Sequence, residues 1–176
     1  MPNDLTKALN SPKLVHPVPG LCFKATEINS KFSLYINICH HDLLESPPNL
    51  SDSELVEAIQ NLQHNRYKIP MAFSEIKLKK GIYVMDVMIS SQYFEKLKSS
   101  LLHFNFIQSL CFSKIELENA NLNFSRENIE VLKNGCFGSL SEFHINPKRS
   151  KLLNLVQEQS KHFLALEKFL DIFHFF

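Results

Sequence analysis

The sequence predicts an α+β domain, in which a mixed β-sheet carries a β-hairpin near the N-terminus and is packed by several α-helices. Apolar residues recur at a two-residue period in residues 34–38 and at three- to four-residue spacings in residues 91–117. The length of 176 residues suits one domain with a core plus an appendage. The formal net charge of +1 gives no overall attraction to nucleic acid or membrane.

The N-terminal part predicts a hairpin. Residues 1–16 are polar and lack periodicity, so we expect a flexible lead-in before a domain that covers residues 17–147. The segments "LCFKAT" and "KFSLYINIC" are strand-like and are joined by the short polar link "EINS". These features predict two antiparallel strands.

The start of the next element is specified locally. Ser51 and Glu54 have the spacing of a capping box, and Leu50 and Leu55 that of a hydrophobic staple. We therefore predict a helix over residues 50–63.

Later segments continue the mixture of strands and helices. We expect an extended segment at residues 67–73, and a buried strand at residues 82–89 in which Asp86 is the one polar residue. Residues 91–117 predict one or two helices, with Ser99 and Ser100 as the break. The remaining expected elements are a short strand at 121–125, a turn-rich return at 132–139 and a C-terminal helix at 148–176.

The cysteines and histidines raise the question of a metal or thiol site. The four cysteines form no CxxC pair, and Cys39-His40-His41 lacks further ligands at a familiar spacing. We interpret this triplet as the end of a core strand, and we expect no metal and no cofactor. The chain has four glycines and no glycine-rich phosphate loop. No segment resembles a secretory signal or a membrane span, so we expect an intracellular protein.

Several segments together resemble one known family. They are "PGLCFKATEINSKFSLYINICHH", "PPNLSDSELVEAI", "YKIPMAF", "YVMDVMISSQYFEKL" and "NLNFSRENIEVLKNGCFGS". In this order they are similar to the blocks of the PIH domain, named for proteins interacting with the Hsp-ninety chaperone. The likeness is greatest to the Nop-seventeen-type subunit of the Rvb–Tah–Pih co-chaperone complex, and it runs from about residue 18 to residue 139.

The resemblance implies a non-enzymatic adaptor that acts in the cytoplasm and nucleus. The implied partners are Rvb-type AAA ATPases, the Hsp-ninety chaperone with its small TPR cofactor, and acidic client segments phosphorylated on serine. Implied clients are box C/D small nucleolar ribonucleoproteins (snoRNPs), kinases and polymerases, with dynein-arm preassembly as the alternative within the family. By the same resemblance, Lys24, Lys31 and Lys80 would bind the phosphate.

Two departures from the family pattern concern the site and the length. The family usually continues Lys-Asn-Arg, whereas here Gly135 follows Asn134, so Lys133 or Arg126 would have to replace the arginine. Family members also carry a second, CS-like β domain that engages co-chaperones, and here the expected domain is followed by one expected helix.

The lysines also allow a structural interpretation. A hairpin loop of two or four residues would place Lys24 directly opposite Lys31, and such like charges are best tolerated where an anion neutralises both. The alternatives are that both lysines extend into water, and that Lys77, Lys79 and Lys80 are a solvated loop face. RNA binding is a third class, which the three arginines of the chain disfavour.

Overall fold

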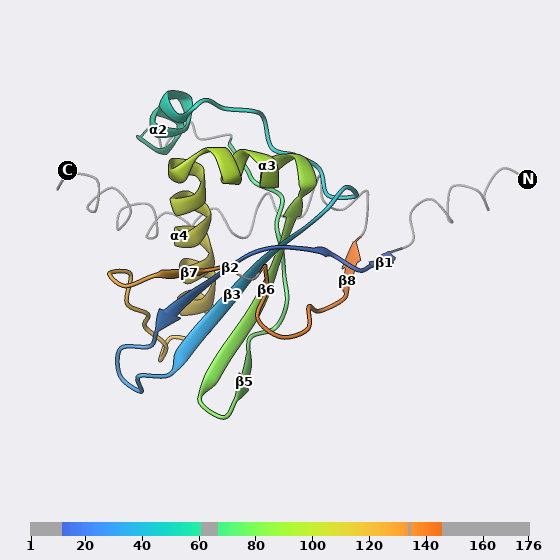
Figure 1. Cartoon of the computed structure of the whole chain (residues 1–176). Helices are drawn as coiled ribbons and strands as arrows, with labels where there is room; N and C mark the ends of the chain where they lie inside the picture. The colour runs from blue at the N-terminus through green and yellow to red at the C-terminus, as the bar shows by residue number, and fades with distance from the viewer. Residues whose placement is uncertain (1–11, 61–66, 134, 146–176) are drawn as a thin grey trace, which may run out of the picture.

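The computed structural model describes residues 12–60, 67–133 and 135–145, which form an α+β unit (Figure 1). The expected C-terminal helix at 148–176 and most of the expected lead-in lie outside the described residues. No helix in the described ranges is long and apolar enough to cross a membrane.

The main sheet has six strands and confirms the predicted mixed type. Its order is β4-β6-β3-β2-β7, and β5 pairs with β6 beside β4. The pairing of β3 with β6 is parallel, whereas the pairings β2–β3, β2–β7, β4–β6 and β5–β6 are antiparallel. The strands are β2 (Val18–Thr26), β3 (Ser33–His41), β4 (Ala72–Phe73), β5 (Lys77–Lys79), β6 (Ile82–Ser90) and β7 (Glu130–Leu132).

Serine side chains cap the helices at their first turns. The capping box forms before α2 (Asp52–Gln60), since Ser51 N donates to Glu54 Oε2 at 2.7 Å and Glu54 N donates to Ser51 Oγ at 3.3 Å. The predicted break at Ser100 separates α3 (Ser91–Ser99) from α4 (Leu101–Glu118). Ser100 ends the first helix through its N–H and starts the second through its hydroxyl, which accepts from His103 N.

The core lies between one face of the sheet and the helices. The strand residues that alternate towards α3 and α4 are fully buried, and aromatic side chains of α4 fill the layer. Phe23 of β2 packs edge to face on both Phe104 and Phe112, with ring centroids 6.1 and 5.8 Å apart. This face includes Phe23, Ala25, Leu34, Ile36, Ile38, Met85, Val87 and Ile89.

Two short elements differ from the sequence expectation. Lys13–Val15 form strand β1, which pairs with β8 (Phe143–Ile145), although the lead-in was expected to reach residue 16. The predicted strand at 121–125 is a single bridge between Phe124 and Glu27, and β7 forms further along. Phe124 is buried in the core although its segment is not a strand. A two-residue alternation of apolar residues cannot distinguish such a segment from a strand.

A buried glutamate sets the length of the β2–β3 loop. The last paired residues are Thr26 and Ser33, so the loop is longer than predicted. Glu27 is 2% exposed, and its carboxylate accepts hydrogen bonds from the Ser30 N–H and hydroxyl, the Asn29 amide and Asn123 N. Desolvation acts to raise the pKa of Glu27, but the hydrogen bonds led by those of Ser30 outweigh it and lower the pKa to about 2.

Glu27→Gln tests this loop through the pH dependence of stability. Because the folded-state pKa lies below the ordinary value of 4.5, the carboxylate contributes stability that is present above about pH 4.5 and is lost as pH falls towards 2. We expect the variant to be less stable than wild type at pH 7, and the difference to shrink on acidification. Urea unfolding at several pH values measures it. A difference that is constant between pH 7 and pH 2.5 would contradict the assignment.

Candidate functional site

The sheet face away from the helices carries a buried polar network. Asn37 and Asp86 are neighbours on β3 and β6, and Asn37 Nδ2 donates to Asp86 Oδ1 at 2.7 Å. Both residues are almost fully buried. A buried carboxylate needs several donors, so this pair requires further partners from another segment.

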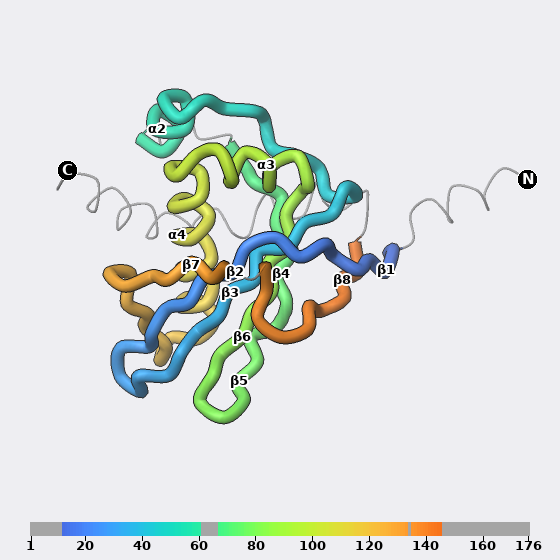
Figure 2. Tube along the Cα trace, viewed as in Figure 1, coloured from blue at the N-terminus to red at the C-terminus, as the bar shows by residue number. Residues whose placement is uncertain are grey.

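The return segment, residues 135–142, supplies those partners. Asn37 accepts from Phe137 N at 2.8 Å and donates to Phe137 O at 3.1 Å. Asp86 Oδ2 accepts from the Ser141 N–H and hydroxyl at 2.8 and 2.7 Å. Figure 2 shows this segment in orange, running past β3 and β6 before it reaches β8. The one polar residue that the sequence marked in β6 therefore anchors a distant part of the chain.

Lys24 lies beside this network on the same face. Its paired neighbours are Tyr35 on β3 and Glu130 on β7, and its Nζ lies 6.0 Å from the centroid of the Tyr35 ring. The same ring stacks on Phe137, with ring centroids 3.8 Å apart. The predicted pairing of Lys24 with Lys31 is wrong. The longer loop at Glu27 shifts the register, so Lys24 pairs with the residue four positions after Lys31.

Lys31 and Lys80 occupy neighbouring turns at one end of the sheet. Lys31 lies in the β2–β3 loop and Lys80 in the two-residue turn between β5 and β6, at the lower edge of Figure 1. Both have left-handed backbones, with φ of 62° and 52°. The turns touch, since a Cβ at Gly81 would lie 3.4 Å from the ring of Phe32. The structure thus brings two of the expected phosphate ligands to the end of the sheet at which the β2–β3 hairpin closes.

The two candidate replacements for the missing arginine differ. Arg126 is committed elsewhere: its guanidinium forms a two-point ion pair with Glu116 at 3.0 and 2.8 Å and lies over the Phe112 ring. Lys133 is exposed directly after β7, three residues beyond the partner of Lys24. Gly135 packs closely against β2, because an added Cβ would lie 3.1 Å from Gly20 O.

The Cys39-His40-His41 triplet occupies the end of a core strand. Cys39 is fully buried and donates to Val87 O at 3.4 Å, and burial raises the pKa of its thiol to about 12. His40 stacks on Phe94 and pairs with the Ser91 hydroxyl at 2.9 Å, and desolvation lowers its pKa. Within the described ranges, no three His, Cys, Asp or Glu side chains are grouped to hold a metal ion.

Together, the fold and the lysine-bearing loops define a small α+β domain with a basic end to its sheet. A sequence model described as the PIH1 N-terminal domain matches residues 5–152. The chain belongs to this family.

Two full-length relatives match most of this chain but are themselves longer. The chain is 32% identical over 161 residues to PIH1 domain-containing protein 1 of Danio rerio, covering 88% of this chain and 54% of the relative. It is 31% identical over 158 residues to the protein of the same name from Xenopus laevis, covering 86% and 52%. The chain thus spans about half the length of these relatives. The solved N-terminal domain of yeast PIH1p has the same fold, with a TM-score of 0.63, 19% identity, and coverage of 77% and 93%.

Asp86→Ala tests the network that holds the return segment. The change removes one acceptor of the Asn37 amide and the acceptor of both the Ser141 N–H and hydroxyl, and we expect a loss of about 3 kcal/mol in the free energy of unfolding. Ser141→Ala removes one of the donors and should cost about 1 kcal/mol. Guanidinium unfolding measures both variants. Equal losses for the two variants would contradict a central role for the carboxylate.

Proposed function

We propose that this domain is a non-enzymatic adaptor that binds acidic segments phosphorylated on serine, as part of a chaperone-linked assembly complex. The observation that carries the proposal is the placement of Lys24, Lys31 and Lys80 at one end of the sheet, in a chain that belongs to the PIH1 N-terminal domain family. Lysine ammonium groups are point-charge donors that suit a phosphate without imposing one geometry.

The chemistry of the ligand follows from the charges. A phosphoserine carries about 1.5–2 negative charges at neutral pH and three acceptor oxygens. Lys31 and Lys80 are exposed, and Lys24 is half-buried along the Tyr35 ring, so all three ammonium groups remain available at the surface. The site therefore favours phosphate over a single carboxylate, and salt should weaken the interaction.

The wider assembly is part of the proposal. In it, Rvb-type AAA ATPases, the Hsp-ninety chaperone and its small TPR cofactor are the machinery, and phosphorylated acidic client segments are the ligands, in the cytoplasm and nucleus. Box C/D snoRNP, kinase or polymerase complexes are the clients, with dynein-arm preassembly as the alternative. Direct RNA binding receives no support from the one arginine within the described residues, because Arg126 is paired with Glu116.

Single lysine substitutions test the site without disturbing the fold. Lys24→Met keeps the aliphatic stem on Tyr35, and Lys31→Gly suits the left-handed backbone. Each removes one charge-assisted hydrogen bond worth about 1.5 kcal/mol, so the affinity for an acidic serine-phosphorylated peptide should fall about tenfold. Isothermal titration measures the affinity, and thermal unfolding shows whether stability holds.

The control is Lys98→Ala on α3, where the lysine pairs with Glu95 at 2.6 Å on the helical side of the domain. Its affinity for the phosphopeptide should equal that of wild type. Wild-type affinity in both site variants, or equal affinity for the phosphorylated and unphosphorylated peptide, would refute the site.

Gly135→Arg tests whether a guanidinium at this position improves the site. Gly135→Ala measures the cost of the Cβ near Gly20 O alone, which should be a modest loss of stability. If the arginine reaches the phosphate, it adds a two-point contact, and affinity should rise several-fold relative to the alanine variant. Unchanged affinity in a folded arginine variant would place Gly135 away from the phosphate.

A further inference from the structure

A second group of lysines faces the same side of the sheet as Lys24. Paired residues on neighbouring strands project from the same face, so the registers can be followed across four strands. One row runs through Lys24, Tyr35, Val84 and Lys77, and the next row through Thr26, Ser33, Ile82 and Lys79. Lys77 and Lys79 on β5 therefore stand across the sheet from Lys24, and Lys80 follows Lys79 in the β5–β6 turn.

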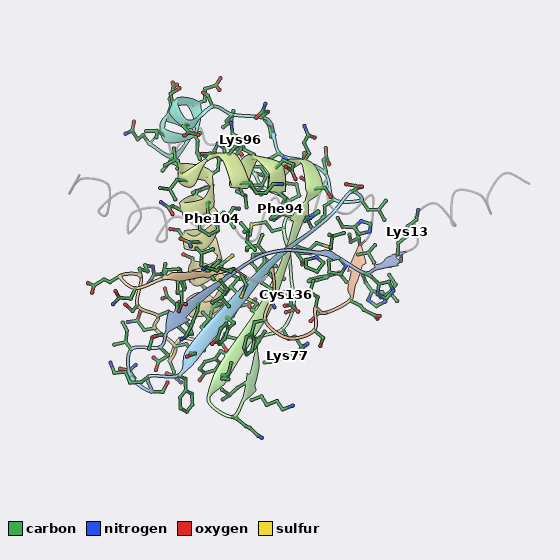
Figure 3. All side chains as sticks on the ribbon, viewed as in Figure 1. Lys13, Lys77, Phe94, Lys96, Phe104 and Cys136 are labelled. Carbon is green, nitrogen blue, oxygen red and sulfur yellow. The ribbon has the colours of Figure 1, made fainter. Side chains whose placement is uncertain are left out.

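The surface between the two groups has polar and apolar parts. Thr26, Ser33 and Ile82, here called the strip, are each half-buried, and the two hydroxyls can donate to an acidic ligand. Phe137 on Tyr35 borders the strip on one side, and the turns of Lys31 and Lys80 border it on the other. Lys77 is positioned by a hydrogen bond of 3.0 Å to the Ser141 hydroxyl, and Figure 3 shows it in the lower half of the sheet, below Cys136.

We propose that Lys77 and Lys79 form a second subsite, which binds a carboxylate of an extended phosphopeptide lying along the strip. This inference rests on the proposed function and adds a spacing to it. Three strand spacings of about 4.8 Å separate β2 from β5, or about 14 Å. An extended peptide rises about 3.3 Å per residue, so a peptide whose phosphoserine is bound at Lys24 places the carboxylate about four residues away.

An acidic peptide fits this surface better than single-stranded RNA does. Bases bind by stacking on open aromatic rings, but the Tyr35 ring is already stacked on Phe137, and Lys24 Nζ lies 6.0 Å from its centroid. The strip therefore selects for charge spacing along an extended chain.

The experiment uses the full chain and a set of peptides with one phosphoserine in an otherwise uncharged sequence. A single glutamate is placed two, four or six residues from the phosphoserine on either side, or left out. We expect the four-residue spacing on one side to tighten binding about two- to fivefold, as for an exposed ion pair. Lys79→Ala should abolish that gain and leave the affinity for the glutamate-free peptide unchanged.

The matched control is Lys13→Ala on β1, which makes the same change in net charge outside the strip and should keep the gain. Lys24→Met should weaken every phosphopeptide, which separates the two subsites. A gain that does not depend on glutamate position, or a loss shared by Lys13→Ala, would overturn the second subsite. The second subsite would also be overturned if Lys79→Ala lost binding of an oligouridine but kept the gain from the glutamate. If phosphorylation itself has no effect on the glutamate-free peptide, the proposed function fails, which is a different result.

Discussion

The hydrogen bond between Asn37 and Asp86 is the interaction on which the rest of the sheet face depends. It joins the two parallel strands at their centre, and the return segment satisfies the other polar atoms of the two side chains. A buried carboxylate without these partners would be strongly destabilising, so the network specifies the path of residues that are distant in sequence. Along that path Phe137 stacks on Tyr35, and the Ser141 hydroxyl accepts a hydrogen bond from Lys77. These contacts position the side chains beside Lys24 and on β5.

A second buried acid has the corresponding role at the end of the sheet. Glu27 collects its hydrogen bonds from within the β2–β3 loop and from Asn123, and so it ties the loop to the segment before β7. The loop then ends on Lys31 in a left-handed conformation. Acidic residues inside the domain thus help to position lysines at the surface of a chain with little net charge.

Local rules predicted the elements, whereas long-range contacts decided the site. The Ser51 and Ser100 caps and the strand around Asp86 were predictable, because each depends on neighbours within a few residues. The β2–β3 register could not be predicted. It depends on the burial of Glu27 against Asn123, a contact distant in sequence that leaves no motif or periodicity near the loop. Strands β1 and β8 were missed because three-residue strands carry too little pattern. The candidate lysines came from a family resemblance, and only the register showed that Lys77 and Lys79 share their face.

The contact between Phe32 and Gly81 makes two loops behave as one body. A ring that packs against a glycine in a left-handed turn leaves neither turn free to move without the other. The backbones that carry Lys31 and Lys80 are therefore linked before any ligand arrives. Less conformational entropy is lost when an anion bridges them than if each loop had to be ordered separately. If the proposed function is correct, this apolar contact contributes to the affinity for a charged ligand that it does not touch.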